Sequence, residues 1–227
     1  KRSNQAFQDI KSLLFTAMAQ IDHYHHHPGP TGIPSGYRLL DSLTSGFQKS
    51  DLIVIAGRPS MGKTALVLSI ARNITVNDQR PVGFFSLEMS SLQLAMRLLV
   101  AEARVDAHKV RSGTLPSDEW SRLASCLAPL HKAPLYIDDT PGLNILDLRA
   151  RARRMVSEKK VELIIIDCLQ LISAQTRAHA NRQEEVSMIS RSLKALAKEL
   201  NIPIIALSQL SRAVEPVSYT HLRAHET

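Results

Sequence analysis

The chain has 227 residues, of which 44% are hydrophobic, and this predicts one large α/β domain, or one domain plus an arm, with a substantial core. The net charge of +7 permits an acidic partner such as nucleic acid, but the charges are spread along the chain, and a slightly basic enzyme fits equally well. No apolar run approaches the roughly 18–20 residues of a membrane helix, and no signal peptide is recognisable. Cys126 and Cys168 form no CxxC pattern, which argues against a zinc ribbon. We expect a cytoplasmic protein without a membrane span.

A helical arm is predicted at the N-terminus. Apolar residues recur at helical spacing between residues 7 and 21, and the stretch 23–32, which contains proline and glycine, then breaks the helix. An ordinary first core helix is the alternative. Because this stretch separates the helix from the rest of the chain, we favour a linker arm, which would span residues 1–30.

From residue 52 onward, apolar runs alternate with amphipathic helices. The predicted strands are 52–56, 82–86, 134–138, 161–167 and 202–208, and the predicted helices are 63–74, 90–103, 118–130, 146–158 and 186–200. Strands that read as solid apolar runs joined by helices indicate an α/β fold with a mostly parallel sheet covered on both faces. We expect the last strand to be left with an exposed edge. We expect the polar tail 216–227 to be unrelated to the domain or disordered.

A phosphate-binding loop is predicted between the first strand and the next helix. The stretch GRPSMGKT fits the pattern G-x-x-x-x-G-K-[ST], in which glycines let backbone N–H groups turn toward phosphate oxygens. The lysine reaches the β- and γ-phosphates, and the threonine hydroxyl is a ligand for Mg²⁺. The alternative is a glycine-rich turn with a surface lysine. The predicted ATP-binding residues are Gly57, Arg58, Pro59, Ser60, Met61, Gly62, Lys63 and Thr64.

Three further polar residues come directly after apolar strands. Asp167 ends the strand VELIIID and is predicted to hold Mg²⁺ together with Thr64, because ligands gather at the carboxyl ends of parallel strands. Glu88 follows the strand VGFFS and is predicted to orient and polarise the attacking water. Gln209 is predicted to contact the γ-phosphate. The alternatives are turn capping for Asp167 and Gln209, and an acid that complements a helix dipole for Glu88.

These motifs together resemble DnaB-type replicative DNA helicases, which are RecA-like P-loop ATPases. The resemblance covers about residues 31 to 215 and includes FFSLEMS, LYIDDTPGL, IIIDCLQLI and ALSQLSR as well as the P-loop. It implies a RecA-like core that couples ATP hydrolysis to translocation and duplex unwinding. It also implies that Lys63 and Thr64 are Walker A residues and that Asp167 is the Walker B aspartate. The catalytic residues that it implies are Lys63, Glu88 and Gln209.

The same resemblance implies partners. The family works as a homo-hexameric ring around single-stranded DNA, and primase and a helicase loader are further expected partners. The arm looks like the linker helix that docks on a neighbouring subunit. Two alternatives stay open at this stage: a recombinase-like, DNA-dependent ATPase that forms filaments, and a non-catalytic module that ATP switches between assembly states.

Several features depart from the family pattern or carry a weaker signal. The family's N-terminal domain is absent, Cys168 stands where many members have tyrosine, and the pattern ends near Glu215, before the expected arginine finger and main DNA loop. We therefore expect a truncated fragment with weak activity alone. The loop 174–182 is a candidate for DNA proximity. The arginines between 149 and 154 are better explained as a solvated helix face.

Overall fold

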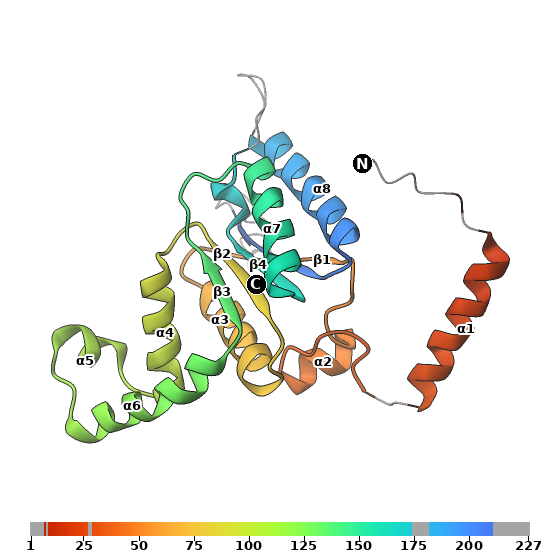
Figure 1. Cartoon of the computed structure of the whole chain (residues 1–227). Helices are drawn as coiled ribbons and strands as arrows, with labels where there is room; N and C mark the ends of the chain where they lie inside the picture. The colour runs from red at the N-terminus through yellow and green to blue at the C-terminus, as the bar shows by residue number, and fades with distance from the viewer. Residues whose placement is uncertain (1–6, 8, 27–28, 174–181, 211–227) are drawn as a thin grey trace, which may run out of the picture.

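The computed structural model describes residues 7, 9–26, 29–173 and 182–210 (Figure 1). The tail 216–227 and nearly all of the candidate DNA loop lie outside the described residues. Within the described part of the chain, no helix combines the length and apolar character that crossing a membrane requires.

The described residues form five strands and alternating helices. In chain order the elements are α1 (Ile10–His26), α2 (Arg38–Thr44), β1 (Leu52–Gly57), α3 (Lys63–Arg72), the π-helix η1 (Asn73–Asn77), β2 (Val82–Ser86), α4 (Ser91–Ala103), α5 (Ala107–Ser112), α6 (Ser117–Lys132), β3 (Leu135–Asp138), α7 (Ile145–Lys159), β4 (Leu163–Asp167), the 3-10 turn η2 (Leu169–Leu171), α8 (Arg182–Leu200) and β5 (Ile204–Gln209).

All five strands are parallel, in the order β1-β5-β4-β2-β3. The predicted parallel sheet is therefore confirmed. The predicted exposed edge of the last strand is wrong, because β5 lies between β1 and β4 and pairs with both. Ile205 of β5 lies opposite Ile53 on one side and Ile165 on the other. The edges of the sheet are β1 and β3.

Each face of the sheet carries its own apolar core, as strand alternation requires. Ile164 and Ile166 of β4 face one core, which α7 and α8 complete with residues such as Leu148 and Leu193. Leu163 and Ile165 of β4 face the other core, which α3 and α4 complete. This is a three-layer arrangement, with helices on both faces of the sheet (Figure 1).

The first helix is exposed along its whole length and contributes no buried residue. Helix α1 runs to His26, so the predicted break at residue 23 is wrong: the His-rich segment continues the helix. Phe15 and Met18 are both exposed by more than 60%. The helix stands apart from the sheet in Figure 1.

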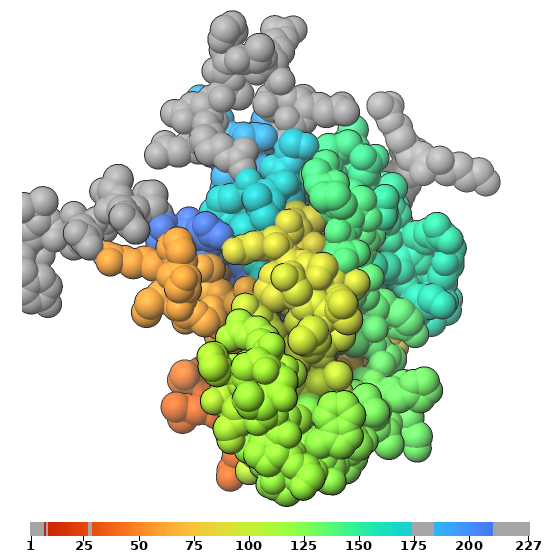
Figure 2. Space-filling view, turned by 90° about the vertical axis from the view of Figure 1, so that its left-hand side faces the viewer, coloured from red at the N-terminus to blue at the C-terminus, as the bar shows by residue number. Residues whose placement is uncertain are grey.

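Helices α4, α5 and α6 form a layer beside the sheet that covers much of the face seen in Figure 2. Helix α4 begins with a capping box, in which Ser90 accepts from the Gln93 amide and the Gln93 side chain accepts from the Ser90 amide. Arg72 of α3 joins this layer through two bonds of 2.6 Å to Glu102 of α4. The start of α4 is therefore well defined, and this start lies next to the site described below.

Candidate nucleotide-binding site

The carboxyl ends of four strands meet in a row at one edge of the sheet. Gly57 at the end of β1 lies opposite Gln209 at the end of β5, and Ser86 at the end of β2 lies opposite Asp167 at the end of β4. Glu88 follows Ser86 by two residues. The structure thus brings the P-loop, Glu88, Asp167 and Gln209 to the same edge.

The P-loop has the backbone that its glycines predict. Gly62 has a φ of 83° at the residue before α3, in the left-handed region that a side chain would disfavour. The loop residues from 58 to 62 are exposed, and the N-terminus of α3 follows at once. The Lys63 ammonium donates to the carbonyl oxygens of Gly57 and Arg58, both at 2.9 Å. The positive charge is therefore held over the loop, beside the first amides of a helix, where an anion is favoured.

Thr64 and Asp167 are already in direct contact across the site. The Thr64 hydroxyl donates to Asp167 Oδ2 at 2.6 Å. Asp167 is only 3% exposed, and burial raises the pKa of its carboxyl. The bond from Thr64 and the positive charges of Lys63 and Arg97 oppose this increase, whereas the charge of Glu88 adds to it. Two adjacent hard oxygen donors, one of them a buried carboxylate, fit a Mg²⁺ site.

Glu88 lies in the short loop between β2 and α4, and its side chain is exposed. A carboxylate oxygen of Glu88, one of Asp167 and the Cys168 sulfur all lie within 4.8 Å of one another. The Leu87 amide donates to the Asp167 carbonyl oxygen at 2.7 Å, which joins the loop to the end of β4. The exposed carboxylate is therefore next to the buried one, open to the solvent side of the site.

Gln209 ends β5 next to the P-loop strand. Its side-chain amide donates to the Cys168 sulfur at 3.8 Å, so the residue after Asp167 contacts the predicted γ-phosphate glutamine. The side-chain amide of Gln170 donates to Ser208 Oγ at 2.9 Å and to the Gln209 carbonyl oxygen at 3.2 Å. The turn after β4 therefore holds the end of β5.

Sequence reasoning missed three residues that support these groups. Ser86, Asp139 and Gln170 each bond to a segment that carries a predicted site residue. Asp139 had a readable signal, since it follows a predicted parallel strand as Asp167 and Glu88 do. The tertiary bonds of Ser86 and Gln170 leave no local pattern in the sequence.

The arginines of α7 face acids, in agreement with the solvated helix face that we predicted. Arg149 and Arg153 both bond to Glu199 of α8, and Arg154 bonds to Glu158 one turn later. Arg151 bonds to Asp138. The arginine charges are thus opposed by carboxylates within 4 Å, which weakens any attraction to nucleic acid.

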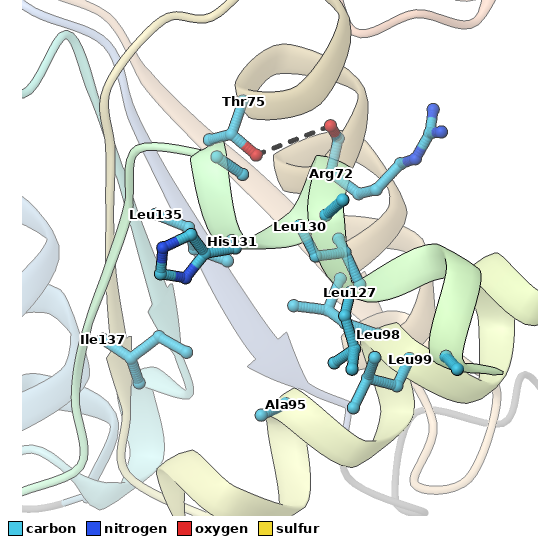
Figure 3. Close-up of a pocket in the computed structure, with 13 residues that line it drawn as sticks. Arg72, Thr75, Ala95, Leu98, Leu99, Leu127, Leu130, His131, Leu135 and Ile137 are labelled. Atoms are coloured by element: carbon cyan, nitrogen blue, oxygen red, sulfur yellow. Dashed lines mark hydrogen bonds between the residues drawn. The ribbon is translucent and has the colours of Figure 1, made fainter.

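An apolar pocket of about 720 Å³ lies elsewhere, between α4, α6 and β3 (Figure 3). Its lining is mostly leucine, alanine and isoleucine, with Arg72, Thr75 and His131 as polar members. Arg72 is bonded to Glu102, and the Thr75 hydroxyl donates to a backbone carbonyl one turn earlier. None of the residues that line this pocket belongs to the P-loop, so it is not the phosphate site.

A parallel sheet with a P-loop between its first strand and the next helix defines a P-loop nucleotide-binding domain. The family model described as the DnaB-like helicase C-terminal domain matches residues 32–220. The chain belongs to this family.

Comparison with individual proteins supports the same family. The chain is 49% identical to the replicative DNA helicase DnaB of Geobacillus stearothermophilus over 216 residues, which are 95% of this chain and 48% of that protein. It is 46% identical to the replicative DNA helicase DnaC of Bacillus subtilis (strain 168), over 95% of this chain and 48% of the relative. The chain therefore spans about half the length of these curated relatives.

Solved structures show the same fold. One solved ATPase domain superposes with a TM-score of 0.83 at 33% identity, covering 92% of this chain and 73% of that one. A DnaB-like replicative helicase, described with its interactions with primase, gives a TM-score of 0.78 at 32% identity, over 92% of this chain and 50% of the other.

Proposed function

We propose that this chain is the ATP-hydrolysing motor domain of a replicative DNA helicase, which couples hydrolysis to translocation on single-stranded DNA and to duplex unwinding. One observation carries the proposal: the Thr64–Asp167 hydrogen bond of 2.6 Å lies beside Glu88 at the P-loop edge of the sheet. This combination supplies a phosphate cradle, two metal ligands and a carboxylate, in a domain of the DnaB-like family.

Each residue then has a distinct chemical role. The P-loop amides and Lys63 bind the phosphates of ATP, and Lys63 leaves the loop carbonyls to do so. Thr64 and Asp167 hold Mg²⁺, which when bound neutralises charge on the β- and γ-phosphates. Glu88 orients the attacking water and accepts its proton. Gln209 contacts the γ-phosphate and, through its bond to Cys168, links that contact to the end of β4.

The assembly that we propose is a homo-hexameric ring with single-stranded DNA at its centre. Its support is the family and the relatives, which are named replicative DNA helicases. The similarity to a helicase described with primase supports primase as a partner, and a loader completes the expected set. We expect a protein with this role to work in the cytoplasm.

ATP binding is the first test. Lys63→Ala should weaken the affinity for a fluorescent ATP analogue by about 10- to 100-fold, because a charged hydrogen bond to phosphate is worth about 1.5–3 kcal/mol. Lys49→Ala is the matched control, since Lys49 is an exposed lysine outside the loop, and its affinity should equal that of the parent. Unchanged affinity of the Lys63 variant would exclude the P-loop assignment.

A non-catalytic ATP switch is the second candidate function, because the Thr64–Asp167 pair would bind Mg·ATP equally well in a protein that does not hydrolyse ATP. Sustained phosphate release that rises with single-stranded DNA supports a motor. A single burst, or binding without release, supports a switch. Rings in electron micrographs support the helicase assembly, whereas filaments would contradict it.

A further inference from the structure

The turn after β3 is bonded to the start of the helix that follows Glu88. Asp139 directly follows β3, and its Oδ2 accepts a hydrogen bond from the backbone amide of Ser91 at 2.7 Å. Ser91 is the first residue of α4. A carboxylate at this position satisfies one of the free amides of the first helical turn and faces the positive end of the helix.

The turn that carries Asp139 is itself held by hydrogen bonds, both within the turn and from α7. Thr140 donates its backbone amide to Asp138 Oδ1 at 3.0 Å. Arg151 of α7 donates to Asp138 Oδ2 and to the Thr140 hydroxyl, both at 2.9 Å. Asp139 is therefore not a loose surface acid, because its neighbours on both sides are bonded to a helix of the opposite layer.

The loop that carries Glu88 is short and is held at both ends. At its start, the Leu87 amide donates to the Asp167 carbonyl oxygen at 2.7 Å. At its end, the Ser86 hydroxyl donates to the Met89 carbonyl oxygen at 2.5 Å, and α4 begins two residues later. Because so few residues separate β2 from the cap of α4, a shift of the first turn of α4 moves Glu88.

We propose that Asp139 is a positioning residue for ATP hydrolysis: by holding the Ser91 amide, it fixes the start of α4 and so places the Glu88 carboxylate beside Asp167. This inference rests on the proposed function for the role of Glu88. The bonds from Ser91 also hold the pKa of the Asp139 carboxyl below its usual range, as expected for a carboxylate that accepts this hydrogen bond. Asp139 acts through Glu88 and does not itself touch the reacting atoms.

The test compares Asp139→Ala with Asp139→Asn and with Asp106→Ala. Asp106 is the matched control, because its carboxylate also caps a helix, accepting from the His108 amide at 2.8 Å at the start of α5. Single-turnover hydrolysis should slow by about tenfold in Asp139→Ala, since a misplacement near 1 Å can cost up to about 100-fold, while the Kd for Mg·ATP stays within about twofold. Asp139→Asn keeps an acceptor and should recover most of the rate. Asp106→Ala should hydrolyse ATP at the parent rate.

A double-mutant cycle separates positioning from general helix stabilisation. In a Glu88→Gln background, Asp139→Ala should have no further effect on the rate, because the group that it positions is already gone. An equal slowing in both backgrounds would overturn the proposal, as would an unchanged rate in Asp139→Ala or a rate loss that Asp106→Ala shares.

Amide hydrogen exchange without nucleotide gives an independent measurement. Asp139→Ala should speed exchange in residues 87–91 by about threefold or more, whereas Asp106→Ala should leave this segment unchanged. Unchanged exchange in Asp139→Ala overturns the positioning role. If the parent chain does not bind ATP, the proposed function fails, but the exchange result still decides whether Asp139 holds this loop.

Discussion

Asp167 and Glu88 lie side by side, yet the protein holds these two carboxylates in different ways. Asp167 ends β4, lies in register with Ser86 and is 3% exposed. Glu88 is exposed, in a loop that depends on a few individual bonds. The backbone bonds that hold the sheet therefore also fix Asp167, whereas Glu88 can move without unfolding anything. We expect changes at Asp167 to alter both function and stability, and changes at Glu88 to alter function alone.

The largest effect is expected at the loop-held carboxylate. In a full-length protein that carries this core, Glu88→Gln should slow hydrolysis by about 10²- to 10⁴-fold, because the amide keeps the shape of the side chain but cannot accept a proton from water. The Kd for Mg·ATP and the melting temperature should stay at the parent values, since the side chain is exposed. Phosphate release and thermal unfolding measure both quantities. Turnover within about threefold of the parent would make Glu88 only an acid near a helix terminus.

Asp167→Asn should change the two quantities that Glu88→Gln leaves alone, namely ATP affinity and stability. Mg²⁺-dependent ATP affinity should fall by about 10- to 100-fold. Burial raises the pKa of Asp167, so ionisation of this group costs stability: its contribution is present below the unfolded pKa of about 4 and is lost as the pH rises through the folded pKa. Without nucleotide, Asp167→Asn should therefore melt at a higher temperature than the parent at pH 7.

The stability difference between Asp167→Asn and the parent should shrink as the pH falls and the aspartate itself becomes protonated. Thermal melts of the two proteins across this pH range measure it. A lower melting temperature of Asp167→Asn at pH 7 would contradict the expected cost of the buried charge.

Ser86→Ala should produce a smaller effect that falls mainly on the rate. The change removes the bond to the Met89 carbonyl that closes the Glu88 loop. We expect hydrolysis to slow by about three- to tenfold through misplacement of the carboxylate, with unchanged ATP affinity. Loss of one hydrogen bond should lower the free energy of unfolding by about 1 kcal/mol. Single-turnover kinetics beside a urea titration separate the two quantities.

Ile166→Val should have the smallest effect on function and should lower stability instead. Ile166 is fully buried directly before Asp167, so loss of a methylene should lower the free energy of unfolding by about 0.5–1.5 kcal/mol. The backbone hydrogen bonds between β4 and its neighbouring strands should keep Asp167 in place, so the rate of hydrolysis should stay within about twofold of that of the parent. A slowing comparable to that of Ser86→Ala would remove the distinction between the strand-held and loop-held groups.

The sequence predicted the strands well, because each is a continuous apolar run with a breaker at its end. All five predicted strands are present, with ends that differ by at most two residues. The P-loop and the polar residues that follow the strands could be placed at one edge for the same reason, since parallel strands end together. The roles of Lys63, Glu88 and Gln209 remain predictions, because geometry brings them together without showing turnover.

Other features depend on long-range contacts and could not be predicted. The short helices α2 and α5 bury no residue and show too few turns for a periodic pattern. The place of β5 in the middle of the sheet depends on pairing with β1 and β4, which no local segment encodes. The bonds of Ser86 and Asp139 likewise join residues that only the folded chain brings together.

The central position of β5 has a consequence for synthesis of the protein. Among the described strands, β1 pairs only with β5, and Leu52 therefore meets its partner Ile204 only after most of the chain has been made. A ribosome that adds about 5–20 residues per second leaves the P-loop strand without a sheet neighbour for on the order of ten seconds. During that interval β1 presents an unpaired apolar edge, and β4 presents a second one from the time it is made until β5 emerges. Such edges favour aggregation. We expect this domain to complete its sheet in one late step, and to depend on chaperones until β5 has emerged.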